Sequence, residues 1–312
     1  MGSAVFKRRQ LSKISASIKI QQLELSRRET GQAIYSDLLS VETRDLLTTG
    51  QQEMESVNLL LNHHSKILSV NHSNHYLIDV GANIGFYTRN FSKRFKFVVS
   101  LEPNPRIFAL LKMNTSQLDN VWIINKGASN SARSLKLIGR KDHSGGGSVC
   151  DKSKLSYLYS IDRSALEEFE IDLIPINDLF KQIKKKILDV KSEIPIIIKI
   201  DVEGHELEVI QGISIEKLEE KPALLLELNG TLASRQQVIA LCKALGYNLF
   251  FTTTDILRAG MKTRAGNASH IFRLGGIRLL INSYLENTVI NLKSPQDVSV
   301  SQLLAVQHHP KN

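Results

Sequence analysis

The sequence predicts a doubly wound α/β domain that follows a helical amino-terminal extension. From residue 76 onward, short runs of apolar and β-branched residues alternate with longer helical segments. Continuous apolar runs are typical of strands covered on both faces, and strands that alternate with helices are typical of parallel βαβ units. Acidic and polar residues follow several of these runs, at the strand ends where α/β sheets bind ligands. These observations together indicate a buried parallel sheet with a ligand site at one edge.

Residues 1–70 show helical periodicity. The apolar residues of "IKIQQLEL", "AIYSDLLSVETRDLL" and "MESVNLLLNHHSKIL" recur at spacings of three and four, with Ser and Thr available as caps. We therefore expect a helical extension over residues 1–70. Four histidines in and just after it lack the spacing of a zinc motif such as HExxH, so no metal site is predicted there. They are His63, His64, His72 and His75.

The domain predicted over residues 71–275 contains seven strands. Their sequences are "YLIDV", "KFVVSLE", "VWIINKG", "IPIIIKID", "PALLLEL", "YNLFFT" and "HIFRL". Helices are expected between the first five strands, among them residues 105–118 and 234–245.

Two segments depart from this rhythm. Residues 130–172 form a variable insertion, either a mobile loop or a hairpin, because the three glycines at 145–147 are poor formers of helix or strand. The insertion is either a plain surface segment or a lid that faces the substrate. Residues 276–312 are weakly patterned, and we expect a helix followed by a tail.

The composition is that of an ordinary soluble globular protein, with 42% hydrophobic and 23% charged residues among 312. No apolar run reaches the ~18 residues of a membrane-spanning helix. Cys150 and Cys242 lie far apart, which argues against a disulfide framework or a zinc site. A cytoplasmic location is expected, with an organellar transit peptide as the alternative. The net charge is +9, and part of the excess of lysine and arginine lies in short basic runs. Such runs are more typical of solvated helix faces than of surfaces that bind nucleic acid or membrane.

The first predicted strand continues into "DVGANIGFYT", where Gly81 and Gly85 fall on a strand-to-helix turn. Glycines at such a turn let the backbone approach a bound ligand. A dinucleotide fingerprint needs a further glycine where Asn83 stands. Asn83 therefore argues against NAD or FAD and for a ligand without phosphates, such as S-adenosylmethionine.

The second predicted strand ends in "VSLEPNP", which places Glu102 at its carboxyl end. An acid at this position accepts hydrogen bonds from both hydroxyls of a ribose. The alternative is a solvated glutamate before a turn. Together with the glycine turn upstream, the position favours ribose binding, and Asn104 of the same turn is included among the candidate cofactor-binding residues.

The fourth predicted strand, "IPIIIKIDVEGHE", breaks from apolar residues into acids beside the glycine turn. Side chains alternate along a strand, so Lys199, Asp201 and Glu203 share one face. Polar groups at the neighbouring strand ends reach the same edge, namely Asp79, Glu227 and Asn229. Because an unpaired buried carboxylate is costly, these acids are expected to serve a function.

At this point the sequence resembles a known family, the FkbM-type S-adenosylmethionine-dependent methyltransferases. The resemblance covers about residues 75–250 and is carried by "LIDVGANIGFYT", by "LEPNP" with "LLKMN", and by "IIIKIDVEGHELEVIQG" with "LLLELN". It implies a class I methyltransferase fold, which is Rossmann-like, with seven strands of which the last is antiparallel. It also implies O-methylation of hydroxyls on sugars, glycans or other small natural products.

The resemblance further assigns roles to residues by position. The cofactor turn is formed by Asp79, Gly81, Asn83 and Gly85, and Glu102 holds the ribose. Asp201 and Glu203 face the methyl-transfer site.

A hydroxyl is a poor nucleophile, so a base must remove its proton as the new bond forms. We expect Asp201 or His205 to be this base, with Glu203 orienting the acceptor or the base. His205 is alternatively a helix residue without a chemical role. A divalent metal bound by these three side chains is a further option, because oxygen and imidazole ligands suit one.

Other functions stay open at this stage. An NAD(P)-linked oxidoreductase is opposed by Asn83. A nucleic-acid methyltransferase is favoured by the positive charge, but "DVEG" stands where base-methylating enzymes have Asn or Asp before Pro-Pro-Tyr. A protein methyltransferase and a binding module with a degenerate pocket are the remaining alternatives. The expected partner is therefore a small-molecule or glycan acceptor, and the oligomeric state is not indicated.

Overall fold

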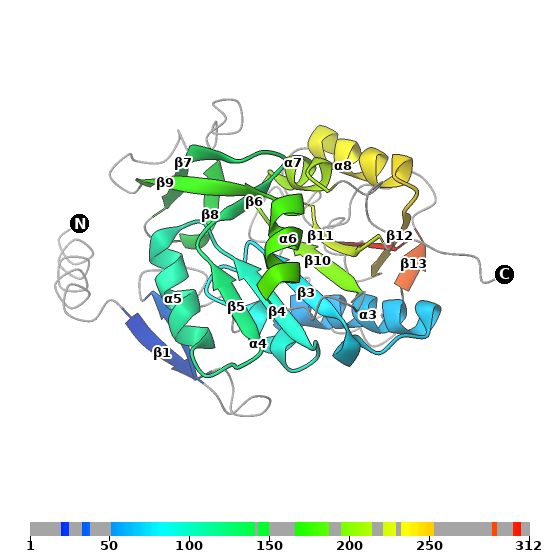
Figure 1. Ribbon diagram of the computed structural model, residues 1–312, viewed down its shortest axis with the longest axis horizontal. Helices are drawn as coiled ribbons and strands as arrows, with labels where there is room; N and C mark the ends of the chain where they lie inside the picture. Colours follow the sequence, from blue (N-terminus) through cyan, green and yellow to red (C-terminus); the bar gives the residue numbers. More distant parts are fainter. Residues whose placement is uncertain are drawn as a thin grey trace, which may run out of the picture.

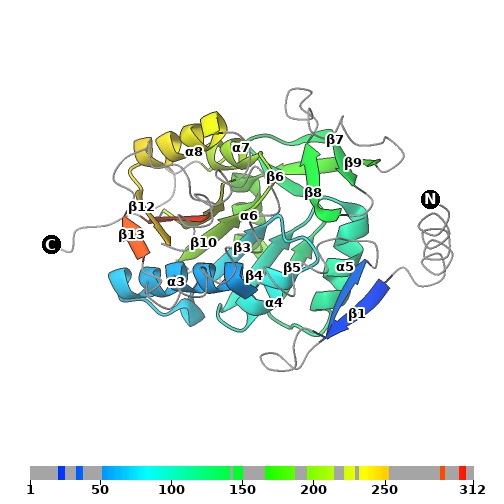
Figure 2. The same ribbon diagram turned by 180° about the vertical axis from the view of Figure 1, so that it is seen from behind.

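The structure is a computed structural model that describes residues 20–24, 33–37, 51–140, 143–149, 166–186, 195–213, 221–228, 232–252, 289–291 and 302–306. Within these residues the strands form three sheets of two, eight and four strands. Figure 1 and Figure 2 show the eight-stranded sheet between two layers of helices. Among the described residues, no helix is both long enough and apolar enough to cross a membrane.

The large sheet has the strand order β13-β12-β14-β11-β10-β3-β4-β5. Its strands are β3 (Tyr76–Val80), β4 (Phe97–Leu101), β5 (Val121–Ile124), β10 (Ile196–Ile200), β11 (Ala223–Glu227), β12 (Asn248–Thr252), β13 (Val289–Asn291) and β14 (Gln302–Val306). The five neighbouring strands β5, β4, β3, β10 and β11 are parallel, whereas β14 is antiparallel to both β11 and β12. The strand order reverses between β3 and β10, so the predicted doubly wound fold with an antiparallel last strand is confirmed. Two of its strands were not predicted, β13 at one edge and β14 between β11 and β12.

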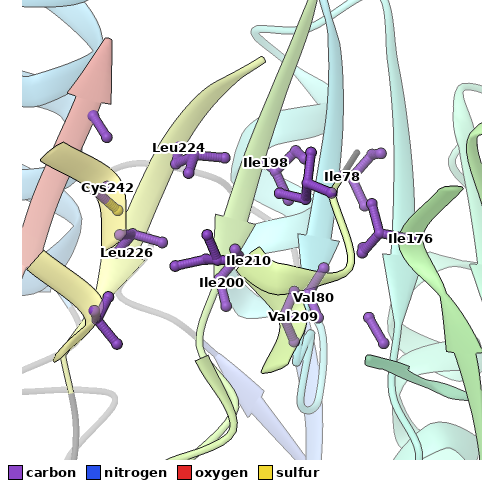
Figure 3. Packing of buried hydrophobic residues seen from close by; sticks show 14 of the residues in the cluster. Ile78, Val80, Ile176, Ile198, Ile200, Val209, Ile210, Leu224, Leu226 and Cys242 are labelled. Carbon is purple, nitrogen blue, oxygen red and sulfur yellow. The ribbon is translucent and has the colours of Figure 1, made fainter. Parts of the chain in front are cut away.

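Helices cover both faces of the sheet because successive strand residues point to opposite sides. One face packs against α3 (Gln51–Leu68), α4 (Phe86–Ser92) and α5 (Pro105–Thr115). The other face packs against α6 (Ile176–Lys186), α7 (Glu206–Gln211) and α8 (Leu232–Ala244). Figure 3 shows the second face, where Ile78, Ile198 and Leu224 of neighbouring strands lie side by side. Helices α5 and α8 fall within about two residues of their predicted starts, a normal difference for helix ends.

The predicted helical extension is only partly correct. Helix α3 is present, and a short 3₁₀ helix, His72–Asn74, precedes β3. However, β1 (Ile20–Glu24) and β2 (Ala33–Asp37) form an antiparallel pair where we predicted helices. Cross-strand pairing with a partner segment overrides a weak helical period. The rest of residues 1–50 lies outside the described residues.

The predicted insertion contributes most of the four-stranded sheet, which has the order β6-β9-β7-β8; only β6 lies before residue 130, and β9 extends past residue 172. Its strands are β6 (Gly127–Ser129), β7 (Arg133–Arg140), β8 (His143–Val149) and β9 (Leu166–Pro175). The hairpin alternative is therefore confirmed. The three glycines at 145–147 lie in strand β8, which the sequence argued against, and the residue pairs with β7 flank them, at His143 and at Ser148 and Val149, with a register shift between.

The carboxyl-terminal segment also differs from the prediction. Residues 276–312 were expected to form a helix and a tail, but they contribute β13 and β14 to the large sheet. Strand β14 lies between β11 and β12, and Leu304 and Ala305 are fully buried there. The strand predicted at "HIFRL", residues 270–274, lies outside the described residues.

Candidate active site at the carboxyl ends of β3, β4 and β10

The turn between β3 and α4 is the glycine turn predicted from the sequence. Gly81, Asn83 and Gly85 have positive φ angles of 82°, 51° and 90°. Glycine adopts these angles freely, and asparagine is one of the few other residues that does so at low cost. A Cβ atom on Gly81 would overlap the backbone carbonyl oxygen of Asp201. The turn is therefore pressed against the end of β10, as the strand order requires.

The same turn is fastened to the end of β4. The backbone amides of Gly81 and Ala82 donate to the carbonyl oxygen of Leu101 at 3.0 and 2.9 Å. The amide of Asn83 donates to Oε2 of Glu102 at 3.0 Å. These bonds hold the first residues of the turn in one conformation, so the site is preorganised.

Glu102 is the buried acid of this site. Its Oε1 accepts a hydrogen bond from the Asn104 amide at 2.9 Å, and its Oε2 accepts the one from Asn83. Burial raises the pKa of Glu102 to about 7, assisted by the negative charges of Asp201 and Asp79 and opposed by the two amide hydrogen bonds. A carboxylate accepts about four hydrogen bonds. Two acceptor positions therefore remain, which fits the two hydroxyls of a ribose.

Asn104 has a different contact from the one we predicted for it. Its Oδ1 accepts hydrogen bonds from the backbone amides of Arg106 and Ile107 at 3.0 and 3.4 Å, so it caps the amino terminus of α5. Its own amide binds Glu102. The structure thus relates Asn104 to the site through Glu102, and direct contact with a cofactor stays a prediction.

A row of buried polar side chains crosses β4, β3 and β10. Asp79 and Ser100 are paired in register and fully buried, and Thr88 of α4 bridges them. The Thr88 Oγ1 atom donates to Oδ2 of Asp79 at 2.8 Å and lies 2.9 Å from the Ser100 hydroxyl. On the other side, Nζ of Lys199 lies 3.4 Å from Oδ1 of Asp79. The row therefore joins the cofactor turn to β10.

Lys199 continues the row to the end of β10. Its Nζ atom donates to Oδ2 of Asp201 at 3.1 Å and lies 4.5 Å from the centre of the Tyr87 ring. Burial by itself lowers the pKa of the Lys199 ammonium, but the carboxylates of Asp201, Asp79 and Glu227 outweigh it and raise the pKa above its ordinary value. The sequence places Lys199 on this face and assigns it no role. The sequence signal for a role is a charged lysine within a run of isoleucines.

The three predicted catalytic residues differ in their burial and in their contacts. The Asp201 side chain is 22% exposed and belongs to the polar row. Glu203 is exposed on the following loop, where it has a φ of 50°. His205 is buried, with Nε2 3.0 Å from the Ser129 hydroxyl of β6 and Nδ1 3.5 Å from Oε2 of Glu208.

This arrangement bears on the metal option. Among the described residues, no group of three or more His, Cys, Asp or Glu side chains is placed to hold a metal ion. The set Asp201, Glu203 and His205 is thus not arranged as a ligand set. Glu227 lies half-buried at the end of β11, and Asn229 lies outside the described residues.

The chain is similar in sequence to known methyltransferases. Methyltransferase sdnD from Sordaria araneosa is 25% identical over 198 residues, which are 57% of this chain and 75% of that protein. Methyltransferase 1 from Beauveria bassiana is 25% identical over 157 residues, which are 45% of this chain and 59% of that protein. Among solved structures, precorrin-6y C5,15-methyltransferase from Geobacter metallireducens has a TM-score of 0.34 at 12% identity, over 63% of this chain and 75% of that chain.

The family is established by sequence over more than half of the chain. The family profile described as the methyltransferase FkbM domain matches residues 79–258. The match begins at Asp79 of β3 and includes the glycine turn, Glu102 and Asp201. The chain belongs to the FkbM family of S-adenosylmethionine-dependent methyltransferases.

Proposed function

We propose that the protein methylates a hydroxyl oxygen of a sugar, glycan or other small natural product. The observation that carries this proposal is the contact between Gly81 of the cofactor turn and the backbone of Asp201. This contact places the partly exposed carboxylate of Asp201 at the edge of the cofactor site. Asp201 and Glu227 carry carboxylates at neighbouring strand ends, and carboxylates are acceptors for hydroxyl donors.

Bound S-adenosylmethionine supplies an electrophilic methyl carbon on a positively charged sulfur. The protein's own residues supply binding, orientation and proton transfer. Glu102 would accept hydrogen bonds from the ribose hydroxyls with the lone pairs that the Asn83 and Asn104 amides leave unused. Asp201 would accept the proton that the acceptor hydroxyl loses when its oxygen takes the methyl group, with S-adenosylhomocysteine as the other product. Glu203, on the exposed loop after Asp201, orients the acceptor.

Asp201 is a better candidate for the base than His205. Its carboxylate is partly exposed, whereas the imidazole of His205 is buried and both of its nitrogens face groups of the protein. The contact with Ser129 ties His205 to the insertion sheet.

The proposal is tested with labelled S-adenosylmethionine and fractions of a lysate of the source cell, with sugars, RNA and protein in separate arms. We expect label in the sugar or small-molecule arm, as an ether that resists mild base. The Asp201→Asn variant should bind S-adenosylhomocysteine but transfer about 10²- to 10⁴-fold more slowly, the usual contribution of a general base. Asp172→Asn, which removes an exposed carboxylate from β9, is the matched control. Label on nitrogen, or in the RNA or protein arm alone, would contradict the proposal.

A further inference from the structure

Lys199 is the one lysine that the structure shows as buried among the described residues, and only 3% of it is exposed. We propose that it is a positioning residue of the methyl-transfer site, which holds the Asp201 carboxylate at the cofactor turn by binding Asp201 and Asp79 at once. The proposal rests on the proposed function only in taking Asp201 as the acid that faces the acceptor.

The geometry fixes both carboxylates through this one ammonium group. Asp79 is held on two sides, because Thr88 donates to its Oδ2 and Lys199 approaches its Oδ1 at 3.4 Å. Lys199 and Asp79 are direct neighbours in the parallel pairing of β10 with β3. The ammonium therefore has a rigid anchor on β3, and from it donates to Oδ2 of Asp201 at 3.1 Å.

Lys199 acts through Asp201 because it does not reach solvent itself. Its side chain is 4% exposed, whereas that of Asp201 is 22% exposed. The Tyr87 ring of α4 lies 4.5 Å from the ammonium, in the range of a cation–π contact. One oxygen of Asp201 is thus engaged by Lys199, while the carboxylate as a whole remains open to an acceptor.

The electrostatics of the row favour positioning over proton transfer. A buried ammonium without partners loses its proton, but the three carboxylates around Lys199 raise its pKa above the ordinary value. It therefore stays charged and is no base. Its charge in turn offsets the mutual repulsion of Asp79, Asp201 and Glu227. Without the ammonium of Lys199, these three acids and the nearby Glu102 would lie at one edge of the sheet with no positive charge to compensate them.

The test is the pH profile of S-adenosylhomocysteine binding, measured by calorimetry between pH 5.5 and 9. Asp201 and Asp79 both raise the pKa of Glu102, so in Lys199→Met, where their charges are no longer offset, we expect this pKa to rise further. We expect affinity at neutral pH to fall about tenfold and the midpoint of the profile to rise by about one pH unit. Adding Asp201→Asn restores the charge balance and should return the midpoint at least halfway. Lys181→Met removes an exposed lysine on α6 and should leave the profile unchanged.

Two results would overturn the proposal. One is a folded Lys199→Met variant with the affinity and midpoint of the wild type, and the other is a midpoint that Asp201→Asn does not move back. A lost packing contact would lower affinity without shifting the midpoint. If Lys199→Met alone does not fold, the single variant Asp79→Asn is compared with the double variant Asp79→Asn/Lys199→Met. Equal midpoints of the pH profile in these two variants would overturn the proposal. These measurements need no acceptor, so they are independent of a failure to find a methylated hydroxyl.

Discussion

Gly81 and Asp201 touch through their backbones, and the carbonyl oxygen of Asp201 occupies the space that a Cβ atom on Gly81 would need. The two residues lie at the ends of β3 and β10, the strands between which the sheet order reverses. This contact brings the cofactor turn and the proposed methyl-transfer site together at one edge of the sheet.

Gly81→Ala should therefore impair both stability and cofactor binding. An alanine at a φ of 82° is strained, and its methyl group would push β3 and β10 apart. We expect a loss of about 2 kcal/mol or more in the free energy of unfolding. Binding of S-adenosylhomocysteine, measured by calorimetry on the folded fraction, should weaken at least about tenfold.

The matched control for that change is Gly246→Ala. Gly246 also has a φ of 82°, but it follows α8, outside the site. This variant should lose stability and keep the affinity of the wild type. Equal affinities in the two variants would mean that the contact between Gly81 and Asp201 does not shape the cofactor site.

Glu102 should make cofactor binding depend on pH. Burial raises its pKa to about 7, and ribose hydroxyls donate only to lone pairs, which favours the ionised form. Affinity for S-adenosylhomocysteine should thus rise with pH up to about 7 and then level off, with at most a tenfold change per pH unit below it. Glu102→Gln should flatten the profile and weaken binding about 10- to 100-fold. Glu170→Gln, an exposed acid on β9, should change neither, and a flat wild-type profile would exclude this role.

His205 should behave as a link between α7 and β6. Ser129→Ala removes the partner of its Nε2 in a fully buried position, which should cost about 1–3 kcal/mol of stability. If Asp201 is the base, His205→Gln should keep methyl transfer within about tenfold of the wild type, whereas Asp201→Asn should not. Single-turnover rates with an identified acceptor measure this. A loss of similar size in both variants would return His205 to the catalytic set.

His64 of α3 and His72 of the following 3₁₀ helix should make the free energy of unfolding fall in mild acid. Nε of Arg94 donates to Nδ1 of His72 at 2.9 Å, and Nε2 of His72 lies 3.0 Å from Nδ1 of His64. Burial, and then the charge of Arg94, lowers the pKa of His72 to about 3. Burial, and then His75 and Arg94, lowers the pKa of His64 to about 4. Both rings are therefore neutral in the folded protein at pH values where they are charged in the unfolded chain.

The sign of the pH effect follows from proton counts. Between pH 6.5 and about 4, the unfolded state binds more protons at these two sites, so stability decreases as the pH falls. Each histidine should contribute up to about 1.4 kcal/mol per pH unit there. The free energy of unfolding, measured with urea at pH 7, 6 and 5, should change less with pH in His72→Gln than in the wild type. An equal pH dependence in the two proteins would mean that His72 is not held neutral by the fold.

Local patterns were sufficient for much of this molecule. The apolar runs of β3, β4, β10 and β11 and the glycine turn were predicted correctly, because a strand buried on both faces must be apolar throughout. The position of Glu102 was also predicted from its place at a strand end. In contrast, β1, β2, β13 and β14 were missed. Their short sequences have no decisive period, and their strand state depends on pairing with segments distant in the chain.

The sequence was therefore sufficient to predict the fold class, the glycine turn and the acids at the neighbouring strand ends, since each depends on residues close together in the chain. The folded structure was needed to show which acids are paired. Lys199 meets Asp79 only because β10 lies beside β3, and His205 turns to Ser129 only because α7 packs on β6. Contacts between distant segments arise from packing and hydrogen bonding in three dimensions, and they give Asp201 and His205 different partners although the two residues are close together in the sequence.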